Sequence, residues 1–352
     1  MCKRILVSQT NTEDGVPFYK IGTIGSTPDA YISKELFDDY KVKYNYPRKG
    51  EVMITCAGTV GKCVVYDGED AYFQDSNIVW IDNPTQYISN GFLFHLLSKV
   101  DWRKLNSTTI IRIYNDDLRN LKMSYPRKEE QQKISHLLSL LDERIATQNK
   151  IIEDLKKLKS AIIDQLYSAI KGKGYSYRQI FEIVNERNKQ LEYSNILSAS
   201  QEKGMVNRED LNLDIQFERS NINTYKVVRK GDYVIHLRSF QGGYAFSDKI
   251  GVCSPAYTIL RPNDLLEFRY LSYYFTSQKF IKSLIIVTYG IRDGRSINVE
   301  EWLDMKTTIP QKEQQRHIVD TIRNIEKKIE NEELYASYLS KQKQYLLRQL
   351  FI

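Results

Sequence analysis

The stretch PRKEEQQKI, from Pro126 to Ile134, returns later in the chain as PQKEQQRHI, from Pro310 to Ile318. Proline is tolerated in the first turn of a helix, and a glutamate close behind it favours the positive end of the helix dipole. In both places a run of regularly spaced apolar residues follows the motif. The same helix is therefore predicted to begin twice, 184 residues apart (positions 126 and 310).

The repeat extends upstream of the two motifs. The segment DDLRNLKMSYP, residues 116–126, aligns with EEWLDMKTTIP, residues 300–310, at the same offset. Further upstream, RKGEVMI from Arg48 aligns with RKGDYVI from Arg229, at an offset of 181. The small change in offset, from 184 to 181, indicates that the two segments are copies of one unit whose loops differ in length. Two copies make an internal duplication and not a solenoid.

Each copy reads as a globular part followed by a helix. Strand-like runs surround a glycine turn in EVMITCAGTVGKCVVYDG and in DYVIHLRSFQGGYAF, and a further strand and an amphipathic helix follow in both. We therefore predict an α+β protein with two pseudo-repeated mixed α/β domains and approximate internal twofold symmetry. The first copy has a shorter lead-in than the second, which begins YSYRQIFEIVNERN. The predicted segments are a first domain at residues 1–125, a helix at 126–172, a second domain at 173–309 and a helix at 310–352.

The two helices are predicted to pack on each other as a coiled coil. Their apolar residues follow a heptad-compatible spacing, interrupted by Arg144 and Gln148 in the first helix and by Glu332 and Lys343 in the second. A helix of about 40 residues is roughly 60 Å long, and the second helix must run back along the first, so the pair is antiparallel. The alternative is that each helix packs separately on its own domain. The predicted seam consists of Ile134, Leu137, Leu141, Ile151, Leu155, Leu158 and Ile162 in the first helix, and Ile322, Ile325, Ile329, Ala336, Leu339, Leu346 and Leu350 in the second.

The composition describes a soluble globular protein with a moderate basic excess. The 352 residues are 41% hydrophobic and 27% charged, and the formal net charge is +7. This charge is compatible with a polyanionic partner but does not establish one. The four cysteines form no C-x-x-C pair and suit a reducing cytoplasm, with small buried thiols as their expected state. The longest apolar cluster, FLFHLLSKV, is interrupted by His95 and Lys99 and is too short to span a bilayer.

The stretch AGTVGKC, from Ala57 to Cys63, has some features of a phosphate-binding loop but fails its requirements. A Walker A loop needs G-x-x-x-x-G-K-[ST] and a following helix. Here the glycines are too close together, a cysteine follows the lysine, and a strand follows in place of a helix. We therefore expect a tight hairpin turn that uses glycine's access to positive φ. Signatures of hydrolases, metalloproteases, dinucleotide-binding proteins and adenine methyltransferases are also missing, so we expect this chain not to be an enzyme.

Several polar loops carry side chains that suit the edges of DNA bases. Arginine pairs with guanine, glutamine and asparagine pair with adenine, and glycines let a backbone lie close to DNA. The alternative is that each loop is only a solvated turn. The corresponding loops differ between the two copies, which suggests that the copies read different sequences. The candidate DNA-binding residues are Lys62, Gln74, Asn77 and Arg112 in the first copy and Arg238, Gln241, Arg292 and Arg295 in the second.

The order of recognition domain, P-x-x-E-Q-containing helix, second recognition domain and second helix resembles the specificity subunit of type I restriction–modification enzymes. The resemblance is carried by RKGEVMITCAGTVGKCVVYD, PRKEEQQKISHLLSLLDERI, RKGDYVIHLRSFQGGYAFSD, SPAYTILRP, YGIRDGRSINVEEW and PQKEQQRHIVDTIRNIEKKI, which span nearly the whole chain. It implies a non-catalytic subunit whose two target recognition domains each read one half of an interrupted DNA site. The helices would set the gap between the half-sites and dock two methylation subunits.

The resemblance also implies which molecules bind elsewhere in the complex. Motor and nuclease activities would belong to a third, restriction subunit. S-adenosylmethionine, ATP and Mg²⁺ would then bind the partner subunits and not this chain, in the cytoplasm and without a membrane. Two other functions stay open from the residues themselves. One is a coiled-coil scaffold whose two domains bind proteins, and the other is a stand-alone DNA methyltransferase or nuclease.

Overall fold

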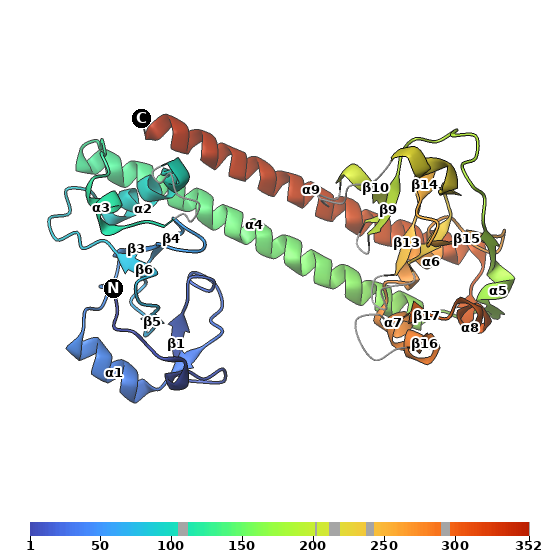
Figure 1. Ribbon diagram of the computed structural model, residues 1–352, viewed down its shortest axis with the longest axis horizontal. Helices are drawn as coiled ribbons and strands as arrows, with labels where there is room; N and C mark the ends of the chain where they lie inside the picture. Colours follow the sequence, from blue (N-terminus) through green and yellow to red (C-terminus); the bar gives the residue numbers. More distant parts are fainter. Residues whose placement is uncertain (105–111, 201–202, 211–218, 237–242, 290–295, 352) are drawn as a thin grey trace. The chain divides into compact units, whose positions relative to one another are not determined.

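The computed structural model describes residues 1–104, 112–200, 203–210, 219–236, 243–289 and 296–351 (Figure 1). The chain divides into two compact units. Unit 1 comprises Met1–Asn149 and Leu334–Ile352, and unit 2 comprises Lys150–Glu333. Each unit contains one globular part together with a stretch of each long helix, α4 (Lys128–Ser168) and α9 (Lys312–Leu350). The expected fold class, two α/β regions joined by two long helices, is confirmed.

The globular part of unit 1 contains two small sheets and three short helices within the described residues. One sheet has the strand order β2-β1-β5 and the other β4-β3-β6. The strand pairs are antiparallel except for the parallel pair β1–β5. The strands are β1 (Val16–Tyr19), β2 (Tyr31–Ile32), β3 (Val52–Thr55), β4 (Cys63–Val65), β5 (Tyr72–Phe73) and β6 (Ile78–Trp80), and the helices are α1 (Lys34–Lys43), α2 (Asn90–Lys99) and α3 (Asn115–Arg119).

Unit 2 is built around a four-stranded antiparallel sheet of order β13-β12-β15-β8. Smaller two-stranded sheets surround it, with the pairs β10-β9, β11-β14, β16-β17 and β18-β7. The strands are β7 (Lys173–Ser176), β8 (Phe181–Val184), β9 (Leu197–Ser200), β10 (Gly204–Asn207), β11 (Lys226–Val228), β12 (Tyr233–Ile235), β13 (Tyr244–Phe246), β14 (Gly251–Cys253), β15 (Thr258–Pro262), β16 (Thr288–Tyr289), β17 (Ser296–Ile297) and β18 (Lys306–Ile309). The helices are α5 (Tyr177–Ile180), α6 (Tyr270–Tyr274), α7 (Gln278–Ser283) and α8 (Val299–Asp304).

Each unit contains an equivalent set of three strands, and in both units the same turn precedes the central strand. Strands β4-β3-β6 of unit 1 correspond to β13-β12-β15 of unit 2. In the R-K-G-[ED] turn before the central strand, the backbone N–H of Arg48 donates to the Glu51 carboxylate at 2.8 Å, and that of Arg229 donates to the Asp232 carboxylate at 2.8 Å. Both turns place glycine at positive φ, +86° at Gly50 and +99° at Gly231. The repeat seen in the sequence is therefore also a repeat of hydrogen bonds.

In each unit, α4 and α9 pack on each other in antiparallel fashion, as the sequence predicts. Within a unit, contacts made by later residues of α4 fall on earlier residues of α9. The alternative, that each helix packs only on its own domain, is therefore wrong. The contacts that show this direction are Asp142–Lys343 and Arg144–Tyr335 in unit 1, and Lys156–Glu333 and Lys159–Glu326 in unit 2.

The predicted seam of α9 is buried or half-buried along its length, but the predicted seam of α4 is wrong at three positions. Leu137, Ile151 and Leu158 are exposed, whereas their neighbours Leu138 and Ile152 are buried. The polar residues that were expected to interrupt the pattern, Gln148, Glu332 and Lys343, lie within the seam. The observed seam passes through Leu138, Leu141, Ile145, Gln148, Ile152, Leu155 and Lys159 of α4 and, at an offset of 184, through Ile322, Ile325, Ile329, Glu332, Ala336, Leu339 and Lys343 of α9.

Within the described part of the chain, no helix combines the length and the apolar character needed to cross a membrane, and no cluster of three His, Cys, Asp or Glu side chains is arranged to hold a metal ion. The four cysteines are free thiols. Burial raises the pKa of Cys56 and of Cys63 to about 11, so both thiols are protonated at neutral pH.

Candidate nucleic-acid interface

The glycine-containing turn at residues 57–61 is the tight hairpin turn that the sequence predicts. It joins β3 to β4, which pair in antiparallel fashion. Gly58 and Gly61 have φ of +66° and +84°. A Cβ at Gly61 would lie 2.2 Å from Cδ1 of Trp102, so this position needs glycine for its backbone angle and for space. The turn is therefore rigidly set between the sheet and the segment that follows α2.

Two of the candidate DNA-binding residues use their polar atoms to hold a neighbouring loop. The Lys62 ammonium group donates to the backbone oxygen of Ile24, and the Gln74 side-chain oxygen accepts the backbone N–H of Ile21 at 3.2 Å. Ile21 also packs against Gly58, where a Cβ would lie 2.7 Å from its Cδ1. Lys62 and Gln74 thus fasten residues 20–25 to the hairpin turn, and in this structure they position a loop.

The other two candidates of unit 1, Asn77 and Arg112, lie close together, because Arg112 bonds the residue before Asn77. Arg112 donates to the backbone oxygen of Ser76 at 3.1 Å, and its guanidinium lies 6.0 Å from the ring centre of Tyr114. Asn77 accepts the backbone N–H of Cys56 at 2.7 Å through its backbone oxygen. The structure therefore brings Lys62, Gln74, Asn77 and Arg112 into one loop cluster. Arg112 and Asn77 remain half-buried at its surface.

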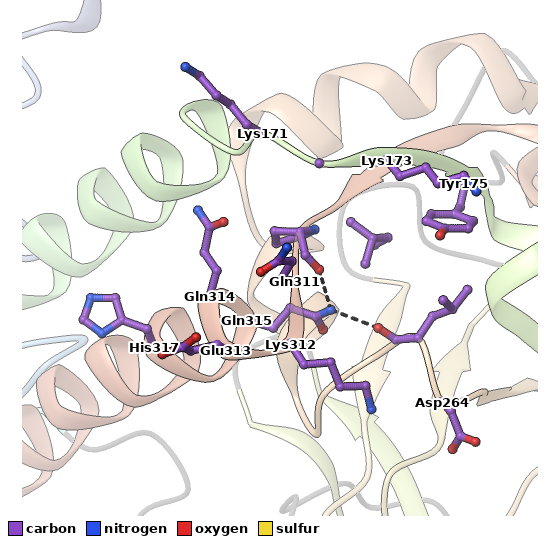
Figure 2. A pocket seen from close by; sticks show the side chains of 14 residues that line it. Lys171, Lys173, Tyr175, Asp264, Gln311, Lys312, Glu313, Gln314, Gln315 and His317 are labelled. Atoms are coloured by element: carbon purple, nitrogen blue, oxygen red, sulfur yellow. Dashed lines mark hydrogen bonds between the residues drawn. The ribbon is translucent and has the colours of Figure 1, made fainter.

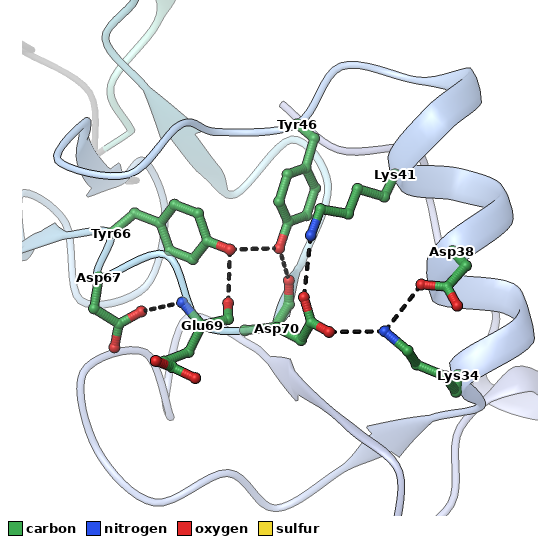
Figure 3. A network of polar contacts seen from close by, with 9 residues as sticks. Lys34, Asp38, Lys41, Tyr46, Tyr66, Asp67, Glu69 and Asp70 are labelled. Carbon is green, nitrogen blue, oxygen red and sulfur yellow. Dashed lines mark hydrogen bonds and ion pairs between the residues drawn. The ribbon is translucent and has the colours of Figure 1, made fainter.

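A polar network anchors the chain that leads into this cluster (Figure 3). Asp70, two residues before β5, accepts hydrogen bonds from Lys34 at 2.7 Å and Lys41 at 3.0 Å, both on α1. Beside it, the Tyr46 hydroxyl lies 2.9 Å from the Tyr66 hydroxyl. Lys34 and Lys41 together hold the pKa of Asp70 below its usual value, which favours the charged pair over a wide pH range. Because β5 runs directly into Gln74, this network fixes where the loop cluster starts.

The four candidates of unit 2 lie outside the described residues. Arg238 and Gln241 fall between β12 and β13, whose ends are joined by a 2.6 Å hydrogen bond from the N–H of His236 to the oxygen of Gly243. Arg292 and Arg295 fall between β16 and β17, which are paired. At the 181-residue offset, residues 237–242 correspond to residues 56–61 of unit 1. In sequence, Lys62 falls between β3 and β4, and Arg238 and Gln241 fall between the corresponding strands β12 and β13.

A buried glutamine fastens each globular part to its helix, and sequence reasoning missed its role. Gln315 is 1% exposed; its side-chain oxygen accepts the N–H of Glu267 at 2.8 Å, and its nitrogen donates to the oxygens of Leu265 at 2.9 Å and Pro310 at 3.0 Å. Figure 2 shows the last two bonds. The glutamine belongs to the repeated motif itself, at the sixth position of PQKEQQRHI, so the repeat contained the signal.

Gln131, at the sixth position of PRKEEQQKI, makes the same three bonds in unit 1. It is 1% exposed, accepts the N–H of Ser89 at 2.7 Å and donates to the oxygens of Tyr87 at 3.0 Å and Pro126 at 2.9 Å. We call these two arrangements the glutamine clasps. The prolines lie just before the helices, which begin at Lys128 and Lys312, and their carbonyls serve as acceptors. The repeated motif is therefore a joint between a globular part and a helix.

A second pair of equivalent contacts joins each globular part to the helix pair. In unit 2, the Tyr273 hydroxyl bonds Glu326 at 2.7 Å, and Glu326 pairs with Lys159. Burial and the Glu326 carboxylate raise the pKa of Tyr273, so its hydroxyl stays a donor. In unit 1, His95 lies 178 residues before Tyr273 and Asp142 lies 184 residues before Glu326. His95 stands near Asp142, which pairs with Lys343.

The His95 side chain makes poorer polar contacts than the Tyr273 side chain, its counterpart in unit 2. Its side chain is 1% exposed, its Nδ1 lies 4.0 Å from Asp142, and neither ring nitrogen has a hydrogen-bond partner among the described residues. Burial lowers the pKa of His95 against the opposing pull of Asp142. The ring is therefore held neutral beside an ion pair.

A hollow of about 980 Å³ lies beside the glutamine clasp of unit 2. Figure 2 shows Lys171, Lys173 and Lys312 around it, together with Asp264 and Glu313. The mixture of positive and negative side chains is typical of a solvated surface depression.

The chain is similar to known proteins over its N-terminal part and over its whole length. Residues 1–157 match the family described as the type I restriction modification DNA specificity domain. Over 155 residues the chain is 50% identical to a curated Haemophilus influenzae protein named as a type I restriction enzyme specificity subunit, a match that covers 44% of this chain and 40% of that protein. The matched part thus spans less than half of this relative.

Two further comparisons extend over the whole chain. A Methanocaldococcus jannaschii protein named as the MjaX specificity subunit is 22% identical over 379 aligned positions, covering 98% of this chain and 88% of the relative. The crystal structure of a type I restriction–modification S subunit from M. genitalium is similar in fold, with a TM-score of 0.56 and 16% identity, covering 100% of this chain and 92% of that one. The two structures thus share a fold in which two α/β regions are joined by two long, packed helices. Residues 1–157 thus match the type I restriction modification DNA specificity domain, and similarity to proteins named as specificity subunits extends over the whole chain.

Proposed function

We propose that this chain is the non-catalytic DNA-recognition subunit of a type I restriction–modification complex and that its two globular parts read the two halves of an interrupted site. One observation carries the proposal. Equivalent glutamine clasps join both globular parts to the helices, yet the sequences between the corresponding strands differ, AGTVG at residues 57–61 against RSFQG at 238–242. Two globular parts that are joined to the helices in the same way but carry different loop sequences are suited to recognising two different DNA sequences.

The chemistry of the candidate residues supports DNA as the ligand. Arg112, Arg238, Arg292 and Arg295 can donate to guanine or phosphate, and Gln241 and Asn77 can pair with adenine. The formal net charge of +7 favours binding to a polyanion. Because Lys62 and Gln74 hold the loop at residues 20–25, we assign them the positioning of the unit 1 loop cluster and leave base contact to their neighbours.

The helices are long enough to hold two DNA-binding parts apart. At 1.5 Å per residue, the 41 residues of α4 extend about 60 Å. We propose that α4 and α9 set the gap between the half-sites and that the complex contains two methylation subunits docked on this chain, with restriction subunits joining through them. In this proposal S-adenosylmethionine, ATP and Mg²⁺ bind the partner subunits.

Electrophoretic mobility shifts test the proposal, once methylation mapping of host DNA with and without this chain has identified the site. The double variant Arg292→Ala/Arg295→Ala should lose at least tenfold in affinity for that duplex, because bidentate arginine–guanine contacts and phosphate contacts are both removed. Lys171→Ala/Lys173→Ala, which removes the same charge from the hollow beside the clasp, is the matched control and should bind normally. Affinity of the unaltered protein should fall tenfold or more between ~50 and ~200 mM salt.

Other outcomes would contradict the proposal. Equal affinity of the arginine variant, with a flat salt response, would exclude DNA reading by these residues. Selective capture of a protein with no preference for any duplex would favour the scaffold. S-adenosylmethionine binding or Mg²⁺-dependent cleavage by the purified chain would indicate a stand-alone enzyme.

A further inference from the structure

The turn between β5 and β6, Asp75–Asn77, has an unusual backbone conformation. Ser76 has a φ of +55°, in the left-handed region that residues other than glycine rarely adopt. The backbone N–H of Asn77 donates to the oxygen of Asp75 at 2.6 Å. Such a conformation persists where the surrounding structure fixes it, and it is common at ligand-binding sites. The contacts of the turn therefore decide its shape.

Two other segments of unit 1 bind the backbone of this turn. Arg112 donates through its guanidinium to the oxygen of Ser76 at 3.1 Å. The N–H of Cys56, the residue after β3, donates to the oxygen of Asn77 at 2.7 Å, and the oxygen of Cys56 accepts the N–H of Ile113 at 2.9 Å. The turn is thus tied to the base of the β3–β4 hairpin and to the segment at Arg112, and it forms part of the unit 1 loop cluster.

The Asp75 carboxylate lies on this cluster without a partner. The residue is half-buried, and within the described part of the chain its carboxylate makes no hydrogen bond and no ion pair, although Arg112 binds the neighbouring residue. Partial removal from water disfavours a carboxylate that has no partner. Its two oxygens keep their full capacity to accept hydrogen bonds. Asp75 is therefore equipped to accept hydrogen bonds from a bound ligand.

The fold itself does not require a carboxylate in this turn, as unit 2 shows. The pairing of β6 with β3 and of β15 with β12 aligns Val79 with Thr258, an offset of 179. At this offset Asp75–Asn77 corresponds to Ser254–Ala256, with the sequence SPA in place of DSN. In unit 2 a serine hydroxyl closes the turn, because it accepts the N–H of the residue two positions later at 3.3 Å. The carboxylate therefore distinguishes unit 1 from unit 2.

DNA presents few groups that suit a carboxylate. The phosphates repel it, so it is suited to a base edge. In the major groove the hydrogen-bond donors are the N4 amino group of cytosine and the N6 amino group of adenine, whereas guanine and thymine present acceptors. The major groove is about 12 Å wide and admits a β-hairpin, whereas the minor groove is about 6 Å wide. A carboxylate carried beside the β3–β4 hairpin therefore distinguishes bases in the major groove by their amino groups.

We propose that Asp75 is a specificity-determining residue of unit 1 and accepts a hydrogen bond from the exocyclic amino group of a cytosine or an adenine in the major groove. This inference rests on the proposed DNA-recognition function and adds the class of base that one residue selects. Arg112 supports the contact in two ways. It holds the backbone of Ser76, and its positive charge offsets the repulsion between the Asp75 carboxylate and nearby phosphates.

Duplexes that lack one amino group test the proposal, with the full chain and the site found by methylation mapping. In each duplex one cytosine is replaced by 2-pyrimidinone or one adenine by purine, which removes the amino group alone. At one position of one half-site, this replacement should weaken binding of the unaltered chain about tenfold, as loss of a base-edge contact does. Asp75→Ala should bind the normal and the replaced duplex equally well, and this comparison cancels the effect of the lost Watson–Crick bond on the duplex.

Asp82→Ala is the matched control, because it removes the same charged group from an exposed position beyond the other end of β6. It should keep the tenfold preference. If Asp75→Ala also keeps it while the unaltered chain still selects the mapped site, the inference is wrong and the proposed function stands. Equal weakening of Asp75→Ala on every duplex, or a requirement only for the N2 amino group of guanine in inosine-substituted duplexes, would also overturn the inference. An unaltered chain that prefers no duplex would overturn the proposed function itself.

Discussion

The glutamine clasps offer the sharpest test of how the globular parts are joined to the helices. Replacing Gln315 by methionine keeps the length and approximate volume of the side chain but removes all three of its hydrogen bonds. The N–H of Glu267 and the oxygens of Leu265 and Pro310 would lose their partner. The same replacement at Gln131 frees the N–H of Ser89 and the oxygens of Tyr87 and Pro126.

The expected cost follows from the number of groups released. A lost hydrogen bond costs about 1 kcal/mol, and a buried group left without any partner costs about 1–3 kcal/mol. The hollow beside Gln315 is lined by Leu265 and Pro310, so water can reach part of the freed backbone and lower the cost. We therefore expect each variant to lose about 2–4 kcal/mol of unfolding free energy, and the two losses to agree within about 1 kcal/mol because the clasps are equivalent.

Urea unfolding followed by circular dichroism measures this loss. The exposed neighbours provide matched controls, since Gln314→Met and Gln132→Met make the same chemical change one residue away on the same helices. They should leave the free energy of unfolding within about 0.5 kcal/mol of the unaltered chain. If the clasp variants are as stable as these controls, the buried glutamines do not hold the joints, and the motif has another purpose.

Three further predictions concern the hairpin turn, His95 and the helix pair. Gly61→Ala should destabilise by about 2–4 kcal/mol through a strained φ and the clash with Trp102, whereas Gly22→Ala, which meets no atom within 4 Å, should not; equal melting temperatures would contradict this. Because burial lowers the pKa of His95, the unfolded chain takes up its proton first as the pH falls through about 6.5, and stability should decline from there toward the lower folded pKa by up to about 1.4 kcal/mol per pH unit. His95→Phe should remove this component, and identical pH dependences of urea midpoints for the two proteins would refute it. Lengthening α4 by one turn, ~5.4 Å, should widen the recognised gap by about one base pair, ~3.4 Å, or abolish binding, and an unchanged gap at full affinity would show that the helices are not the spacer.

The register of α4 shows where sequence reasoning stopped. The helix carries adjacent apolar residues at Leu137–Leu138, Leu140–Leu141 and Ile151–Ile152, so periodicity alone allows two neighbouring stripes. Packing against α9 buries one of them and leaves the other in solvent. The offset of 184 indicates which stripe of α4 is buried. It aligns Gln148 with Glu332 and Lys159 with Lys343, so the polar positions belong to one heptad pattern that both helices follow.

For the candidate DNA-binding residues, the residue type did not reveal the hydrogen-bond partner. Their residue types suit base edges, but Lys62 bonds a carbonyl 38 residues away and Gln74 an amide 53 residues away. Such partners are set by how loops fold over one another, and a side chain with hydrogen-bonding capacity is equally suited to either role. Arg112 and Asn77 stay at the surface of the same cluster, where contact with a ligand is possible.

The sequence by itself determined the duplication, the two long helices, their antiparallel direction and the hairpin turn between β3 and β4. These features depend on local spacing, on glycine and proline, and on the constraint that a second helix must return along the first. Only the tertiary structure decided that the sixth residue of each repeated motif is a buried clasp and that a histidine stands neutral beside Asp142. Those outcomes depend on which distant groups become buried together, because burial makes the hydrogen bonds of a glutamine important for stability and disfavours the charged form of a histidine.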